Sequence, residues 1–202
     1  MTVPQHLRTD RRSERIRGKI KHPVFIKRLC HDLYSERKKR LIHELVGMIN
    51  QFVNQPEINA PVQTNGTGSN ALNIIRFFRN SDAVKVDFVL SNKQDAKIVS
   101  SAKEEGVNVV VVSNQEVEAS DKIIELCIAN KIDYIILAGF LRKIPEKLIR
   151  HYPDRIINIH PSLLPKYGGK GMFGANVHKA VLENNEKESG ITIHFVNSEF
   201  DK

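Results

Sequence analysis

Residues 132–138, with the sequence Ile-Asp-Tyr-Ile-Ile-Leu-Ala, form a nearly continuous apolar run in a chain of 202 residues. A second run, Val-Asn-Val-Val-Val-Val at 107–112, precedes it, and a third run at 156–159 follows it. Consecutive apolar residues, rather than alternating ones, are typical of strands in a sheet whose two faces are both covered by helices. We therefore expect all three runs to be buried strands.

Segments with helical spacing separate these predicted strands. The positions of the apolar residues predict helices over 69–78, roughly 94–105 and 118–130, a short helix after Pro145, and another strand at 84–90. Regular alternation of strands with helices at this spacing favours a parallel sheet. The predicted fold class is α/β, with a doubly wound, mostly parallel, Rossmann-like sheet.

Positive charge is concentrated at the N-terminal end of the chain. Residues 1–60 contain 13 Lys and Arg against 6 Asp and Glu, so this end carries most of the formal net charge of +8. Residues 1–22 have few apolar side chains and are expected to form a mobile arm, whereas the apolar spacing over 23–52 is helical. Residues 53–64, with two prolines, indicate a linker or an irregular strand. The interpretation is a basic extension at 1–60, partly helical or disordered, before a domain at 61–202.

Several classes of protein are excluded by what the sequence lacks. No run approaches the roughly 18 apolar residues that span a membrane, and no apolar segment follows the basic N-terminus as in a secretory signal. Cys30 and Cys127 form neither a disulfide framework nor a zinc site, and the histidines show no metal-ligand spacing. We therefore expect a cytoplasmic protein with no metal and no membrane partner.

A glycine-rich segment, Gly66-Thr67-Gly68-Ser69-Asn70-Ala71, begins the first predicted helix. Glycines let the backbone approach an anion, and the free N–H groups of a helix N-terminus favour phosphate. A nicotinamide site would also need a clean preceding strand and an acid after the next one. Here Pro61, poorly tolerated in a central strand, precedes the loop, and Ser91-Asn92 ends the next strand. Taken alone, the segment is a phosphate site or a tight turn.

The apolar run at 156–159 carries Asn158, with His160 two residues later. Residues two apart in a strand point to the same face, and the carboxyl edge of such a sheet is where ligands bind. A carboxamide donor beside an imidazole is suited to stabilising a developing oxyanion. The alternative is a polar pair that satisfies local backbone groups at the end of the strand.

The segment Asn158-Ile159-His160-Pro161-Ser162-Leu163-Leu164-Pro165 resembles the signature of the folate-dependent formyltransferase family. Other segments that resemble the family occur in its order, at 66–70, 89–93, 137–142 and 190–196. The resemblance implies transfer of a formyl group from 10-formyltetrahydrofolate to an amine. Within the family, the sequence most resembles the branch that formylates glycinamide ribonucleotide in purine biosynthesis.

Two other branches of the family are weighed against this one. In the branch that formylates methionyl-tRNA, an Arg-Gly-Ala-Ala-Pro run usually follows the signature, whereas Lys170-Gly171-Met172-Phe173-Gly174 follows it here. The branch that hydrolyses formyltetrahydrofolate typically has an N-terminal regulatory domain unlike residues 1–60. Both stay as alternatives to the glycinamide ribonucleotide reading.

The resemblance also implies roles for individual residues. The catalytic residues are Asn158 and His160, which stabilise the tetrahedral intermediate, and Asp201, which positions water and assists proton transfer. The residues that bind the substrate, including its phosphate, are Gly68, Ser69, Asn70, Lys170 and His194, although a lone strand histidine is about as often a packed core residue. The residues that bind the folate are Phe140, Leu141, Arg142, Lys143, Ile144, Ile156 and Ile157, those at 140–144 largely through backbone groups.

The chain also departs from the family. The family opens with an apolar strand where 58–65 is polar and contains a proline, and it continues past the position of Asp201 with a strand and a helix. A domain at 61–202 without those elements is expected to have little or no transformylase activity, since its catalytic carboxylate would lie on a fraying terminus.

The contrasting hypothesis is a non-catalytic fragment or fusion whose basic arm contacts nucleic-acid phosphates. Thirteen cationic residues in 1–60 could supply such salt-dependent affinity. The segment has few aromatic residues and no nucleic-acid-binding motif, so a solvated charged helix is the favoured interpretation. The sequence makes no prediction of the oligomeric state.

Overall fold

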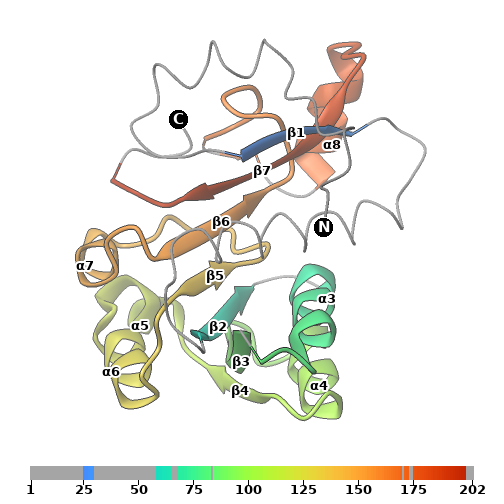
Figure 1. The fold of residues 1–202 in the computed structure, drawn as a ribbon. Helices are drawn as coiled ribbons and strands as arrows, with labels where there is room; N and C mark the ends of the chain where they lie inside the picture. The colour runs from blue at the N-terminus through green and yellow to red at the C-terminus, as the bar shows by residue number, and fades with distance from the viewer. Residues whose placement is uncertain are drawn as a thin grey trace, which may run out of the picture.

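The computed structural model describes residues 25–29, 58–64, 68–82, 84–169, 171–172 and 175–198. These residues contain one seven-stranded sheet in the order β1-β7-β6-β5-β2-β3-β4 (Figure 1). Its strands are β1 (Phe25–Leu29), β2 (Ile58–Thr64), β3 (Val84–Ser91), β4 (Asn108–Val111), β5 (Ile135–Leu137), β6 (Ile156–His160) and β7 (Ser189–Phe195). Its helices are α3 (Ser69–Phe78), α4 (Lys97–Glu104), α5 (Asn114–Ala119), α6 (Asp121–Ala129), α7 (Glu146–His151) and α8 (Ala175–Glu183).

The five neighbouring strands β6, β5, β2, β3 and β4 are parallel. β7 pairs antiparallel with β6, and β1 pairs antiparallel with β7 at the edge of the sheet. Helices α3 and α4 cover one face of the parallel part, and α5, α6 and α7 cover the other (Figure 1). Ile135 and Ile136, consecutive in β5, are both fully buried, one in the core of each face. The predicted doubly wound, mostly parallel sheet is confirmed.

The direction of the chain through the sheet reverses at β2. From β2 the chain proceeds outward through β3 to β4, and β5 then returns to the other side of β2. Ligands of doubly wound sheets bind outside the carboxyl ends of the strands at such a switch point. The loops after β2, β3, β4, β5 and β6 all leave the sheet at this carboxyl edge, which places the candidate site there.

Pro61 lies in a central strand, although proline is poorly tolerated there. Of the two alternatives predicted for 53–64, a linker or an irregular strand, the structure has an irregular strand at 58–64. β2 lies between β5 and β3, and its register against β3 shifts between Ala60 and Val62. A register shift leaves one residue outside the regular ladder, so Pro61 sits where its missing N–H is tolerated. Ala60 and Val62 are fully buried, so even this polar stretch contributes to the core.

The predicted helix over 118–130 is two helices. Ser120, fully buried with φ 66°, lies between α5 and α6, and its hydroxyl donates to the carbonyl of Val117 at 3.1 Å. A left-handed residue ends a helix, so the apolar periodicity continues across a break that spacing alone does not reveal.

The helix predicted from residue 23 is also corrected at its start. Phe25–Leu29 is β1, which pairs antiparallel with Ser189–Ile193 of β7. An edge strand such as β7 would otherwise present unpaired backbone groups, and this long-range pairing overrides local helical spacing. The mobile arm predicted at 1–22 and the rest of the predicted helix lie outside the described residues. The division at residues 60 and 61 stays a prediction, although β2 begins at Ile58.

No helix in the described part of the chain is long and apolar enough to cross a membrane.

Candidate active site

The neighbouring strands β6 and β7 carry polar residues on one face of the sheet and apolar core residues on the other. Ile157 and Ile159 of β6 belong to the core under α3 and α4, so the alternating residues Asn158 and His160 point to the opposite face. The antiparallel register places Asn158 opposite His194 and His160 opposite Thr192. The structure therefore brings together the predicted Asn158, His160 and His194, and adds Thr192.

Asn158 and His194 contact each other directly. Asn158 Nδ2 lies 3.0 Å from His194 Nε2, and His194 Nδ1 lies 3.2 Å from the backbone oxygen of Phe195. Because an amide nitrogen donates and a carbonyl oxygen accepts, both contacts require a neutral His194 with its proton on Nδ1. His194 then fixes the orientation of the Asn158 amide, and the second N–H of this amide has no acceptor among the described residues.

His160 is fixed by the loop that follows β6. The ring is 4% exposed, and its Nε2 donates to the backbone oxygen of Tyr167 at 2.8 Å. Ser162 donates its hydroxyl to the backbone oxygen of Lys166 at 2.8 Å, which closes the same loop. The backbone of the loop that directly follows β6 therefore orients the ring of His160.

Thr192 anchors the first half of this loop from β7. Its buried hydroxyl donates to the backbone oxygen of Ser162 at 2.7 Å and accepts from the backbone N–H of Leu164 at 3.0 Å. A buried hydroxyl satisfied in both directions holds its partners in one arrangement. Sequence reasoning missed Thr192, although it lies two residues before His194 and therefore on the same face of the strand.

Of the predicted phosphate segment, the structure describes residues 68–71, where α3 begins. Gly68 has φ 73° and is the N-cap of α3, and no side chain caps this helix. Its first turn therefore offers backbone N–H groups at the carboxyl edge, beside Ser69 and Asn70, which are exposed and half-buried. This geometry suits an anion, whereas β3 still lacks the acid of a nicotinamide site.

The predicted folate loop, 140–144, follows β5. Leu141 is 45% exposed, whereas Ile144 is buried. Within the described residues, the backbone groups of Phe140, Leu141 and Arg142 form no hydrogen bond with other protein atoms. Ile156 and Ile157, assigned to the same pocket by resemblance, are fully buried core residues. The loop therefore has backbone groups without partners among the described residues, and an exposed apolar side chain, to offer a ligand.

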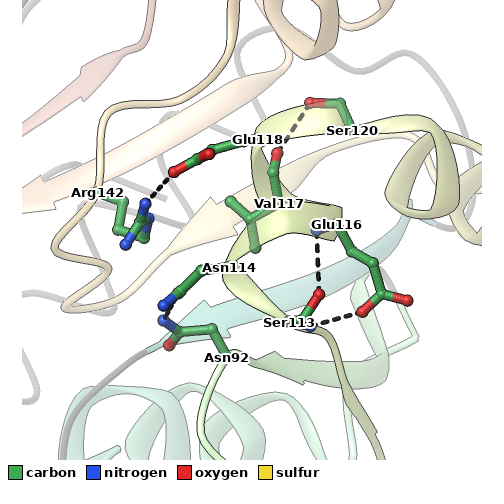
Figure 2. Close-up of polar contacts among 8 residues, drawn as sticks. All are labelled: Asn92, Ser113, Asn114, Glu116, Val117, Glu118, Ser120 and Arg142. Atoms are coloured by element: carbon green, nitrogen blue, oxygen red, sulfur yellow. Dashed lines mark hydrogen bonds and ion pairs between the residues drawn. The ribbon is translucent and has the colours of Figure 1, made fainter.

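Helix α5 ties this loop to the one after β3 (Figure 2). Glu118 forms an ion pair with Arg142, and Asn114 accepts a hydrogen bond from Asn92 Nδ2 at 2.7 Å. Asn114 and Glu118 are one helical turn apart and so lie on one side of α5. A short helix thus positions two of the loops at the carboxyl edge.

A capping box starts α5. The Ser113 hydroxyl accepts from the Glu116 backbone N–H at 3.2 Å, and Glu116 Oε2 accepts from the Ser113 N–H at 2.6 Å (Figure 2). The hydrogen bond from Lys122, at 2.6 Å, together with those from Ser113, lowers the pKa of Glu116 to about 2. The ion pair with Lys122 depends on an ionised Glu116, and the hydrogen bond from the Ser113 N–H is stronger to the carboxylate.

We predict that Glu116→Gln slightly lowers the melting temperature at pH 7, because it removes the charge while keeping an acceptor in the cap. A lowered folded-state pKa contributes stability above the unfolded value of about 4.5, and this contribution is lost as the pH falls towards about 2. The difference from the wild type should therefore shrink between pH 5 and 2 in thermal unfolding followed by circular dichroism. A difference that does not vary with pH would contradict this assignment.

Two predicted site residues, Asp201 and Lys170, lie outside the described residues, and their roles stay predictions. Cys127 is fully buried, and burial raises the pKa of its thiol to about 12, so it is not an activated nucleophile. Among the residues that the structure describes, no three His, Cys, Asp or Glu side chains are grouped so that they could hold a metal ion.

Sequence reasoning also missed two buried acceptors at the carboxyl edge. Gln63 at the end of β2 is 1% exposed, and Asn92 follows β3; within the described residues, Gln63 Oε1 and Asn92 Oδ1 have no hydrogen-bond partner. Buried acceptors without partners are rare, so these two oxygens are candidates to accept hydrogen bonds from a ligand. Polar residues at the ends of apolar strands are the signal that points to them.

The sequence profile described as Formyl transferase matches residues 60–202. The chain belongs to this family.

Relatives within the family are phosphoribosylglycinamide formyltransferases. The protein from Arabidopsis thaliana, described as chloroplastic, is 42% identical over 127 residues, which are 60% of this chain and 42% of that protein. The protein from Escherichia coli is 36% identical over 149 residues, which are 71% of this chain and 68% of that protein. The crystal structure of the protein from Anaplasma phagocytophilum superposes with a TM-score of 0.65 at 29% identity, covering 72% of this chain and 67% of that one.

The chain spans less than half the length of two plant relatives, from Arabidopsis thaliana and Vigna unguiculata, and 11% of a trifunctional relative from Drosophila melanogaster.

Proposed function

We propose that this chain transfers a formyl group from 10-formyltetrahydrofolate to the amine of glycinamide ribonucleotide, a step of purine biosynthesis. The observation that carries the proposal is the placement of Asn158, His160 and His194 on one face at the carboxyl edge of the sheet, with Asn158 in contact with His194. The names of the relatives support the choice of substrates. Hydrolysis of formyltetrahydrofolate is the alternative reaction for the same site.

The chemistry of these residues fits formyl transfer. When an amine attacks the formyl carbon, negative charge develops on the formyl oxygen and positive charge on the nitrogen. The second N–H of the Asn158 amide is a preorganised donor for that oxygen, and His160 lies two residues along the same face. The proton lost from the amine then passes towards an acceptor, for which sequence resemblance names Asp201.

The carboxyl edge also suits the two substrates. A pterin ring has N–H donors and a flat apolar surface, which match the unpartnered oxygens of Gln63 and Asn92 and the exposed Leu141. The phosphate of glycinamide ribonucleotide suits the uncapped N-terminus of α3 at Gly68. We infer from this match that the folate lies near the loops after β3 and β5, and the phosphate near the loop after β2.

The test is an assay of the purified chain with 10-formyltetrahydrofolate, with and without glycinamide ribonucleotide. Tetrahydrofolate that appears only with the ribonucleotide, together with the formylated product, supports the proposal. Tetrahydrofolate and formate without the ribonucleotide would favour hydrolysis, and no turnover with either would overturn the proposed activity. Turnover at the level of the Escherichia coli relative would also contradict the sequence-based expectation of little or no activity.

Three other sequence predictions remain open. A cytoplasmic location stays a prediction, since two plant relatives are described as chloroplastic. The absence of a bound metal also stays a prediction. Nucleic-acid binding by residues 1–60 concerns residues that lie mostly outside the described part of the chain, and no described contact favours it.

A further inference from the structure

Tyr167 adopts an unusual backbone conformation next to the candidate site. Its φ is 57°, in the left-handed region that residues other than glycine rarely adopt. This conformation belongs to the turn in which the backbone oxygen of Tyr167 accepts the hydrogen bond from His160 Nε2. Such strain persists only where surrounding contacts fix it, and it occurs often at functional sites.

Glu186 supplies a contact that fixes Tyr167 from outside the loop. A single oxygen, Oε1, accepts from the Tyr167 hydroxyl at 3.0 Å and from Lys166 Nζ at 2.7 Å. Glu186 lies between α8 and β7, and its backbone N–H donates to Val181 at 3.1 Å, which ties it to the end of α8. The hydrogen bonds from Lys166 and Tyr167 lower the pKa of Glu186, so the carboxylate stays ionised as an acceptor.

The contacts of Glu186 with Lys166 and Tyr167 matter more for the geometry of the loop than for the stability of the fold. The Lys166 side chain is 68% exposed and the Glu186 side chain 26% exposed, and ion pairs this open to water contribute little to global stability. The geometric consequence is larger, because the two residues bound by Glu186 are the two whose backbone oxygens receive Ser162 and His160. Fixing their side chains therefore fixes the acceptors that orient the histidine.

We propose that Glu186 is a positioning residue, which holds Tyr167 so that its backbone oxygen keeps the proton of neutral His160 on Nε2. The other ring nitrogen, Nδ1, is then the one without a proton. For catalysis this rests on the proposed function, since the tautomer decides which ring nitrogen can take a proton during formyl transfer. The effect on the tautomer itself does not depend on any activity.

The experiment uses the full chain with 15N-labelled histidine, at about two pH units above the ordinary histidine pKa of about 6.5. The His160 signals are assigned by their loss in His160→Gln, and long-range proton–nitrogen spectra report which ring nitrogen carries the proton. We expect the Nε2–H form in the wild type and a mixture of both forms in Glu186→Ala. Glu186→Gln should keep the wild-type pattern, because its amide oxygen still accepts from Tyr167.

Two further variants separate positioning from a general loss of structure. Glu183→Ala removes another exposed ion pair, with Lys179 at 3.7 Å, from the end of α8. It should leave the tautomer of His160 unchanged. Tyr167→Phe removes only the hydroxyl and should shift the tautomer in the same direction as Glu186→Ala, which keeps the test valid if Glu186→Ala does not fold. In the formyl-transfer assay, Glu186→Ala should lower kcat roughly 10-fold or more with KM changed less than about twofold.

The outcomes distinguish this inference from the proposed function. A tautomer that shifts in Glu186→Ala and Tyr167→Phe but not in Glu183→Ala supports positioning, even if the chain has no formyl-transfer activity. An unchanged Nε2–H form in both Glu186→Ala and Tyr167→Phe overturns it, whatever the activity.

Discussion

Asn158→Ala is expected to lower kcat for formyl transfer by about 10²–10³, the usual cost of removing one oxyanion donor. KM should change little, because the donor acts on charge that develops only after the substrates are bound. The measurement is steady-state kinetics with each substrate varied in turn. A folded variant whose kcat stays within about threefold of the wild type would refute the assignment of Asn158.

A second effect of this change has to be measured separately. Asn158→Ala also removes the donor to His194 Nε2 at 3.0 Å, and an unpaired buried acceptor typically costs about 1–3 kcal/mol of stability. Urea unfolding of the variant shows whether the loss of activity comes from unfolding. Asn130→Ala is the matched control, because its amide donates to the backbone oxygen of Leu126 at 2.8 Å on the surface, away from the carboxyl edge. Asn130→Ala should lower the stability somewhat and leave kcat unchanged.

Asn158→Asp tests the sign of the required charge. The shape of the side chain is nearly unchanged, but two acceptor oxygens replace the amide donor, and a negative charge faces the developing oxyanion. Activity should be at least as low as in Asn158→Ala. Recovery of activity by the aspartate would show that the position needs only its shape.

The sheet could be predicted because its strands are apolar at consecutive positions. A run such as Ile135–Leu137 has no other stable place than between two helical layers. The same argument fails at β2, where Gln63 and Thr64 are polar yet 1% exposed. Their burial follows from the central position of the strand between β5 and β3, which only the complete topology defines.

The site was predicted only in part for a similar reason. That Asn158 and His160 share a face follows from the period of a strand, whereas their partners depend on contacts distant in sequence. His194 meets Asn158 through an antiparallel register across 36 residues. Tyr167 meets His160 through a backbone oxygen in a left-handed turn, and backbone oxygens carry no sequence signal. A sequence shows which side chains can take part in chemistry, but it does not show the contacts that orient them.

Gly68→Ala is expected to cause a large loss of stability. A Cβ built on Gly68 would lie 2.5 Å from Ile98 Cβ, 2.6 Å from its Cδ1 and 2.7 Å from its Cγ1. Ile98 is fully buried in α4, and a smaller side chain there would still keep the Cβ at 2.5 Å. Relief therefore requires α3 and α4 to move apart, so we expect overpacking of about 1–3 kcal/mol in addition to backbone strain.

Gly106→Ala isolates that overpacking from backbone strain. Gly106 has φ 79°, close to the 73° of Gly68, but a Cβ there would meet nothing within 4 Å. Its alanine variant should lose only the left-handed cost of about 1–2 kcal/mol in urea unfolding, and Gly68→Ala should lose clearly more. Equal losses would show that α3 and α4 adjust without cost.

The same comparison tests the proposed phosphate site. Because Gly68 is the N-cap of α3, a shift of α3 away from α4 also displaces the N–H groups proposed to bind the substrate phosphate. Gly68→Ala should therefore raise KM for glycinamide ribonucleotide more than KM for 10-formyltetrahydrofolate, and Gly106→Ala should change neither. If both constants rise equally in Gly68→Ala, the phosphate lies elsewhere, and the glycine serves only the packing of α3 against Ile98.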